Sequence, residues 1–117
     1  MMHSISTNGH IQMANEILHA VLGYEYGELI GKTIFDFYQQ EYHESAKEGL
    51  KTILSDGYHK TVRSQMVHKN KSLIEVELVS KILMDDNGKR LGTITVSRPL
   101  DMDYLVKCLP QIWFHQF

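Results

Sequence analysis

The chain has 117 residues, of which 43% are hydrophobic and 22% charged, and its formal net charge at pH 7 is −2. This length predicts a single domain, and the composition is that of a globular protein and excludes a disordered chain. No apolar run approaches the roughly 18 residues that cross a bilayer, and the weakly negative charge excludes the basic surface typical of nucleic-acid-binding domains.

The first part of the chain predicts a β-hairpin followed by a helix. Residues 2–6 are expected to form a strand, and Asn8-Gly9 is a strong signal for a two-residue turn before a second strand at 11–13. Asn15 is predicted to cap the next helix with its side-chain oxygen. Gly23 is predicted to end that helix in a left-handed conformation.

Three further helical segments are predicted before the pattern changes. A short helix through Glu28–Ile30 is expected to end at Gly31, and residues 33–38 are expected to form another helical turn with aromatic side chains. Glu41–Ser55 has apolar residues on one stripe and charged residues opposite. This pattern predicts the best-defined helix of the domain.

Beyond residue 57 the period of the pattern changes from that of a helix to that of a strand. His59–His68, Leu73–Met84 and Leu91–Ser97 are the predicted strands, and Lys69–Ser72 and Asp86–Gly88 are the turns between them. Strands at both ends of a block of helices predict an α+β fold, with an antiparallel sheet that is covered on one face.

Residues 99–117 are predicted to form an extension. A helix break is expected at Pro110. Before it, four apolar residues share one helical stripe: Met102, Leu105, Val106 and Leu109. Because a short apolar tail is not expected to stay in water, it should pack on the outer sheet face over Val79 and Leu83 or form a dimer contact. A third possibility is that it begins a connection to another domain.

The residue pattern predicts neither a catalytic site nor a metal site. The seven histidines include no pair spaced i,i+4 for metal binding, and no phosphate-binding loop or activated nucleophile is recognisable. Glu75 and Glu77 share a strand face, where they are expected to be solvated or to pair with Arg63 or Lys81. We therefore predict that the chain is not an enzyme.

In their order and spacing, several short stretches resemble the PAS family of sensory domains. The resemblance covers residues 1–98 and implies a PAS fold, a five-stranded antiparallel sheet whose inner face and helices enclose a small pocket. It divides the chain into a PAS domain at 1–98 and an extension at 99–117. The stretches that carry it are Asn8–Ile11 with Ala14-Asn15, Leu22–Tyr24, Glu28–Lys32, Ile53-Leu54 with Gly57, Val76–Leu78 and Asp85–Gly88.

The resemblance implies a function in signal transduction. PAS domains sense small molecules, cofactors, light or redox state, and commonly dimerise. They usually belong to histidine kinases of two-component systems, cyclic-dinucleotide enzymes or transcription regulators. A ligand-binding sensor that forms a homodimer and acts on a downstream signalling domain is therefore implied. The lone Cys108 predicts a reducing compartment, the cytoplasm, and a chain that starts at the first strand is expected to be a fragment.

Two cofactors of the family are not expected. Covalent flavin photochemistry needs a cysteine between the first helix and the long helix, and this stretch contains none, which excludes it. Haem-binding members need a histidine on the long helix that points at the sheet. Alignment on Gly57 places Ala46 there, with His43 nearly a turn earlier, so haem is not expected. The expected ligand is thus an unidentified small molecule.

Alternation along the strands predicts the pocket. If Val76 and Leu78 face inwards, Ser80 also faces inwards and places a hydroxyl on an apolar wall. The alternative is a ligand-free interaction or dimerisation module in which the same side chains fill the core. The candidate ligand-binding residues are Phe37, Tyr42, Ala46, Leu50, Met66, Leu78, Ser80 and Thr95. Gln65 is an alternative to Met66, and Val96 is an alternative to Thr95.

Two positions depart from the family pattern. Pro99 stands where many members have an aspartate that couples the sheet to a downstream helix, which puts the usual route of signal output in question. Lys71 stands where glycine is common in the turn. Asn70 is therefore expected to supply the left-handed residue of that turn.

Overall fold

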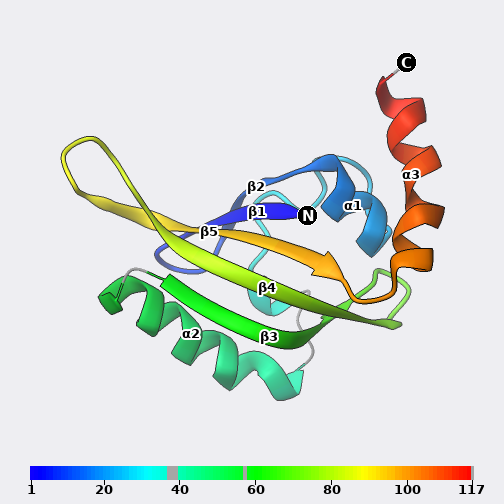
Figure 1. The fold of residues 1–117 in the computed structure, drawn as a ribbon. Helices are drawn as coiled ribbons and strands as arrows, with labels where there is room; N and C mark the ends of the chain where they lie inside the picture. The colour runs from blue at the N-terminus through cyan, green and yellow to red at the C-terminus, as the bar shows by residue number, and fades with distance from the viewer. Residues whose placement is uncertain (37–39, 57, 117) are drawn as a thin grey trace.

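The described residues form a five-stranded antiparallel sheet, which organises the domain (Figure 1). The computed structural model describes residues 1–36, 40–56 and 58–116. The strands are β1 (Met2–Ser6), β2 (Ile11–Ala14), β3 (Tyr58–Val67), β4 (Leu73–Met84) and β5 (Arg90–Pro99). Their order is β2-β1-β5-β4-β3, so that β1 of the N-terminal hairpin pairs with the last strand. The predicted α+β fold and its strands are confirmed.

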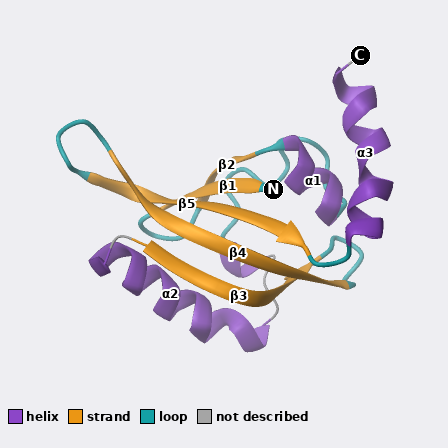
Figure 2. Cartoon of the chain, in the orientation of Figure 1, coloured by secondary structure: helices purple, strands orange, loops and turns teal. Residues whose placement is uncertain are grey.

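Helices cover part of the sheet and extend beyond it (Figure 2). In the described part they are α1 (Glu16–Leu22), α2 (His43–Asp56) and α3 (Met102–Gln116), with short 3₁₀ turns η1 (Ile34–Asp36) and η2 (Gln40–Tyr42). α2 lies along β3 and contacts β3, β4 and β5, whereas α1 lies beside α3 and touches β1. Within the described ranges, no helix has the length and hydropathy that a membrane crossing requires.

The two predicted ends of α1 are confirmed. The Asn15 side-chain oxygen accepts the Leu18 N–H at 3.1 Å and so caps the first turn. Gly23 has a φ of 78° and its N–H donates to the Ala20 carbonyl oxygen. A left-handed glycine at this position stops the helix and redirects the chain.

A buried histidine organises the segment after α1, where the predicted helix at Glu28–Ile30 is instead a series of turns. His19 Nε2 accepts the N–H groups of Gly27 (3.0 Å) and Leu29 (3.2 Å). Nδ1 therefore carries the proton and donates to the Asn15 carbonyl oxygen at 3.0 Å. The helix prediction was wrong because the imidazole binds amides that lie eight and ten residues further along the chain, and no local pattern reports such a bond.

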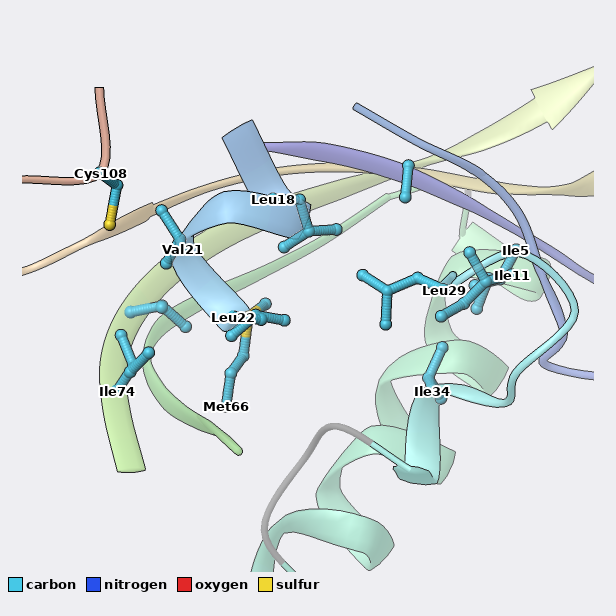
Figure 3. Packing of buried hydrophobic residues seen from close by; sticks show 12 residues of the cluster. Ile5, Ile11, Leu18, Val21, Leu22, Leu29, Ile34, Met66, Ile74 and Cys108 are labelled. Atoms are coloured by element: carbon cyan, nitrogen blue, oxygen red, sulfur yellow. The ribbon is translucent and has the colours of Figure 1, made fainter. Parts of the chain in front are cut away.

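The hydrophobic core lies between α1 and the sheet (Figure 3). Leu18, Val21 and Leu22 of α1 are fully buried. They belong to one cluster that also includes residues of the hairpin, the turns after α1, β3, β4 and α3: Ile5, Ile11, Ala14, Leu29, Ile34, Met66, Ile74, Val76 and Cys108. The core thus ties the N-terminal hairpin to the later strands.

β3 contains a β-bulge that the sequence did not predict. Thr61 lies opposite Leu78 and Ser64 lies opposite Val76, so three steps along β3 match two steps along β4. One extra residue changes which side chains of a strand face the core. The alternation of inward and outward positions therefore does not run unbroken through β3.

The C-terminal extension differs from its prediction in two ways. α3 runs through Pro110 instead of ending there. Pro110 and Val106, one turn earlier, are both exposed, so water can replace the backbone hydrogen bond that proline cannot make. α3 also packs on α1 and not on the outer sheet face: the Tyr104 hydroxyl donates to the Val21 carbonyl oxygen, and Cys108 is buried in the core.

The turn between β3 and β4 corrects the expected role of Asn70. Lys71, and not Asn70, has the left-handed conformation, with a φ of 76°. The Asn70 side-chain oxygen instead accepts the N–H (2.9 Å) and the hydroxyl (2.6 Å) of Ser72. The two residues therefore stabilise the turn in different ways.

We expect Lys71→Gly to raise the free energy of unfolding by about 0.5–1 kcal/mol. Glycine adopts the left-handed conformation without the steric strain that a lysine side chain causes, and this gain exceeds the loss from the greater freedom of glycine in the unfolded chain. Urea unfolding followed by circular dichroism measures this change. Asn70→Gly is the matched control and should lower stability, because it removes the oxygen that Ser72 binds. A Lys71→Gly variant that is less stable than the wild type would contradict the argument.

Candidate functional site

One face of the sheet, which we call the inner face, carries the buried side chains of β4 and β5. Along β4, Val76 and Ser80 are buried, and Leu78 between them is half-buried. Glu75 and Val79 alternate with them and are exposed on the outer face. This alternation follows from the period of two in a strand and agrees with the predicted orientation of β4.

Three polar residues form one row across the middle of the inner face. Thr95 of β5 lies opposite Ser80 of β4 on one side and opposite His3 of β1 on the other. We call these residues the polar row. Their exposed fractions are 2% for His3, 4% for Thr95 and 5% for Ser80. Residues directly opposite one another in a sheet share a face, so the polar row is one contiguous buried strip.

The two hydroxyls of the polar row are hydrogen-bonded to each other. Ser80 Oγ and Thr95 Oγ1 are 2.6 Å apart. A hydroxyl has one hydrogen to donate and two lone pairs to accept with. One mutual bond therefore leaves the pair with one further O–H donor and several acceptor positions, which a bound molecule could use.

A third hydroxyl lies two residues further along the same face of β5. Ser97 is 4% exposed, and its Oγ has no hydrogen-bond partner among the described residues. Because a buried polar atom without a partner costs roughly 1–3 kcal/mol, most such atoms in proteins are satisfied. Ser97 Oγ thus presents unused hydrogen-bonding capacity beside the Ser80–Thr95 pair.

His3 is the functional candidate that the sequence prediction missed. Burial, with a smaller effect of the N-terminal ammonium, lowers the pKa of His3 from 6.5 to about 4. The ring is therefore neutral near pH 7 and contributes one N–H donor and one acceptor to the polar row. The hairpin signal at Asn8-Gly9 indicated that β1 belongs to the sheet, but it did not indicate which strand lies beside β1.

The predicted ligand-binding residues fall into three groups. Ser80, Thr95 and Leu78 lie together on the inner face. Met66 is fully buried but lies opposite Ile74, at the apolar end of the sheet that packs on α1 (Figure 3). Phe37 is outside the described residues. Tyr42 lies in η2, and Ala46 and Leu50 lie in α2, with their side chains outside the described part of the structure.

The start of α2 is packed against η1. The His43 ring meets the Phe35 ring edge-on, with centroids 5.3 Å apart and planes at 62°. The Lys47 ammonium lies 5.8 Å from the centroid of the same ring. These contacts help to hold α2 over the strands that carry the polar row.

The carboxylates on the outer face are surface groups of the sheet. Of the two carboxylates expected to be solvated or paired, Glu75 is exposed to solvent. Glu77 pairs with Arg98, directly opposite it on β5, and not with Arg63 or Lys81. Both side chains of the pair are exposed, and such surface pairs contribute little stability. Among the residues that the structure describes, no cluster of three or more histidine, cysteine, aspartate or glutamate side chains could hold a metal ion.

Comparison with known proteins gives a family and a fold. A family model for the PAS domain matches residues 1–98. A search of curated proteins finds no match. Among solved structures, the PAS domain of a protein from Colwellia psychrerythraea has a TM-score of 0.77 at 16% identity, with 86% of each chain covered.

Two other solved structures are similar to a comparable degree. The PAS-B domain of Cycle from Drosophila melanogaster has a TM-score of 0.76 at 14% identity, covering 85% of this chain and 98% of the other. The PAS domain of an HTR-like protein from Haloarcula marismortui has a TM-score of 0.71 at 22% identity, covering 86% and 80%. At these identities the structural likeness supports the fold alone. Together with the family model, which spans most of the sequence, it leads to one conclusion: this chain belongs to the PAS domain family.

Proposed function

We propose that this PAS domain is a sensor that binds a small molecule at the polar row, on the inner face of the sheet. The observation that carries the proposal is Ser97 Oγ, which is buried without a partner among the described residues, next to the Ser80–Thr95 hydroxyl pair. Ligand pockets typically combine apolar walls with a few such polar groups. A PAS domain is a sensory module used in signal transduction and is not itself catalytic.

The similar structures are consistent with this proposal. The PAS-B domain of Cycle has been solved with glycerol bound and with ethylene glycol bound. Both are small polar molecules, of a size that the middle of a PAS sheet could contact. Their binding belongs to that protein, and it supports the present proposal by analogy of fold only.

The sensor would pass ligand occupancy on through a homodimer to a signalling domain, such as that of a histidine kinase of a two-component system, a cyclic-dinucleotide enzyme or a transcription regulator. Binding would favour one of two arrangements of the sheet and the segments that flank it. We propose that it acts in the cytoplasm, where a free thiol such as Cys108 stays reduced.

A second candidate function is a ligand-free interaction module. It is favoured by the outer face, where Met2, Val96 and Val79 lie opposite one another in one row. Their exposed fractions are 36%, 50% and 41%. An exposed apolar row of this kind suits a contact with another protein surface.

Native mass spectrometry of the protein, purified without glycerol or related additives, tests the proposed function. We expect a mass above that of the polypeptide, which denaturation releases. Thr95→Val removes one hydroxyl of the polar row at nearly constant volume and should reduce the bound fraction. Thr7→Val, at an exposed position in the hairpin turn, is the matched control and should retain it.

A weakly held ligand can be lost during purification, so a second measurement completes the test. The ¹⁵N-labelled protein is screened by NMR against a library of small molecules. The proposed function is overturned if the purified protein has the polypeptide mass alone and no compound shifts the amide signals of Ser80, Thr95 and Ser97. The interaction module would then be the better description.

A further inference from the structure

We infer that the ligand is a small uncharged molecule with hydroxyl, carbonyl or amide groups, and that His3 is one of its contact residues. This inference rests on the proposed function, because it names the class of molecule that the polar row would bind. It is argued from the charges and hydrogen-bonding groups of the inner face and of the elements around it.

The buried polar side chains of the described residues are limited to serine, threonine and histidine. On the inner face they comprise the polar row with Thr93, Ser97 and Ser64. No lysine, arginine, aspartate or glutamate of the described strands is buried as a residue. Oε2 of Glu16, in the first turn of α1 and not on the sheet, is a buried carboxylate oxygen. The wall can therefore donate and accept hydrogen bonds, but it offers no charged side chain as a counter-ion.

The charged side chains that the structure describes in the neighbouring strands lie elsewhere. Glu77 and Arg98 pair with each other on the outer face, where Glu75 and Lys81 are exposed as well. In α2, the charged residues with described side chains are exposed: Lys47, Glu48, Lys51 and Asp56. None of these groups is buried against the polar row.

The N-terminal ammonium contributes to lowering the pKa of His3, and it is engaged in the plane of the sheet. Met1 N donates to the Ser97 carbonyl oxygen at 2.7 Å, and the Met1 carbonyl oxygen accepts the Ser97 N–H at 2.9 Å. Such a reciprocal pair is the ladder pattern of antiparallel strands. These two bonds extend the β1–β5 ladder, and they direct the ammonium towards the backbone of β5 and not towards the inner face.

A charged ligand at the polar row would lose its hydration without gaining an ion pair. Burying an unpaired charge is much more costly than burying a hydrogen-bonded neutral group. A neutral imidazole and three hydroxyls match a neutral ligand better, since each can both donate and accept. The polar row and Ser97 thus favour a molecule with two or more neutral polar groups.

The test compares two probes with the same three-carbon skeleton, of which one is uncharged and the other is an anion. Glycerol is uncharged, and glycerate carries a carboxylate in place of one hydroxymethyl group. Each is titrated into the ¹⁵N-labelled full chain at pH 7, and the amide signals of Thr95, Ser97 and His3 are followed. We expect glycerol to bind more tightly than glycerate by about tenfold or more.

Substitutions then test the contact residues. His3→Gln and Thr95→Val should each weaken glycerol binding by about tenfold, whereas His10→Gln and Thr7→Val, both at exposed positions, should leave it unchanged. Signal dispersion in the NMR spectrum verifies that each variant is folded. If His3→Gln binds glycerol as the wild type does, His3 is not a contact residue.

The outcomes separate this inference from the function on which it rests. Tighter binding of glycerate at the same amides would overturn the uncharged ligand and leave the sensor function standing. If neither probe shifts these signals, the inference fails, and the result also counts against the sensor function. Tighter binding of glycerol, lost in the two row variants, would support both.

Discussion

Replacing Gly92 with alanine is expected to lower the free energy of unfolding by about 4 kcal/mol or more, near the upper limit for single substitutions. Gly92 lies in β5 opposite Ser6 of β1 and has a φ of 142°, a conformation that suits glycine. A β-carbon at this position would lie 1.8 Å from the Ile5 carbonyl oxygen. The clash is with backbone, so relief requires a shift of β1 away from β5.

Urea unfolding followed by circular dichroism measures this loss, and a variant that is unfolded without denaturant would also meet the expectation. Gly9→Ala is the matched control, because Gly9 has a φ of 87° but no atom within 4 Å of its would-be β-carbon. It should lose only the strain energy of a left-handed residue, about 1–2 kcal/mol. Equal stability losses in the two variants would contradict the proposed backbone clash.

Features of the fold that depend on neighbouring residues could be predicted from the sequence. Asn15 caps α1, Gly23 ends it, and the hairpin turns at Asn8-Gly9, because each preference is exerted within a few residues. The strands followed from alternation and β-branched residues in the same way. These local signals in their order also carried the resemblance to the PAS family.

Features that depend on contacts distant in the sequence could not be predicted in the same way. His19 binds the amides of Gly27 and Leu29 and so turns a predicted helix into a loop. Gly92 is required by the close approach of β1, which no pattern within β5 reveals. The packing of α3 on α1 is a third such feature: the Tyr104 hydroxyl donates to the Val21 carbonyl oxygen, 83 residues earlier in the chain, and the sequence did not predict this contact.

The candidate site shows the same division. Ser80 follows from alternation along β4 and could be named from the sequence. In β5 the sequence left Thr95 and Val96 as alternatives, and the structure places Thr95 on the inner face. His3 could not, because its place beside Thr95 depends on the pairing of the first strand with the last. The family resemblance implied a five-stranded sheet, but the register of that pairing had to come from the structure.

His3 also predicts how the stability of the domain depends on pH. Its pKa is about 4 in the folded protein, mainly because of burial, against an ordinary value of 6.5. Below pH 6.5 the unfolded chain therefore takes up a proton that the folded protein does not, and the free energy of unfolding falls as the pH falls. The loss is complete near pH 4. With about 1.4 kcal/mol for each tenfold change in proton affinity, it amounts to roughly 3 kcal/mol.

Comparison with His3→Gln isolates this contribution from that of the carboxylates that titrate in the same range. Between pH 7.5 and pH 4, measured by urea unfolding, the wild type should lose about 3 kcal/mol more than His3→Gln, since glutamine does not titrate. His10→Gln removes an exposed histidine and should behave as the wild type does. Parallel pH profiles for the wild type and His3→Gln would mean that the imidazole is not held neutral by burial. The polar row would then lose the uncharged character on which its expected ligand depends.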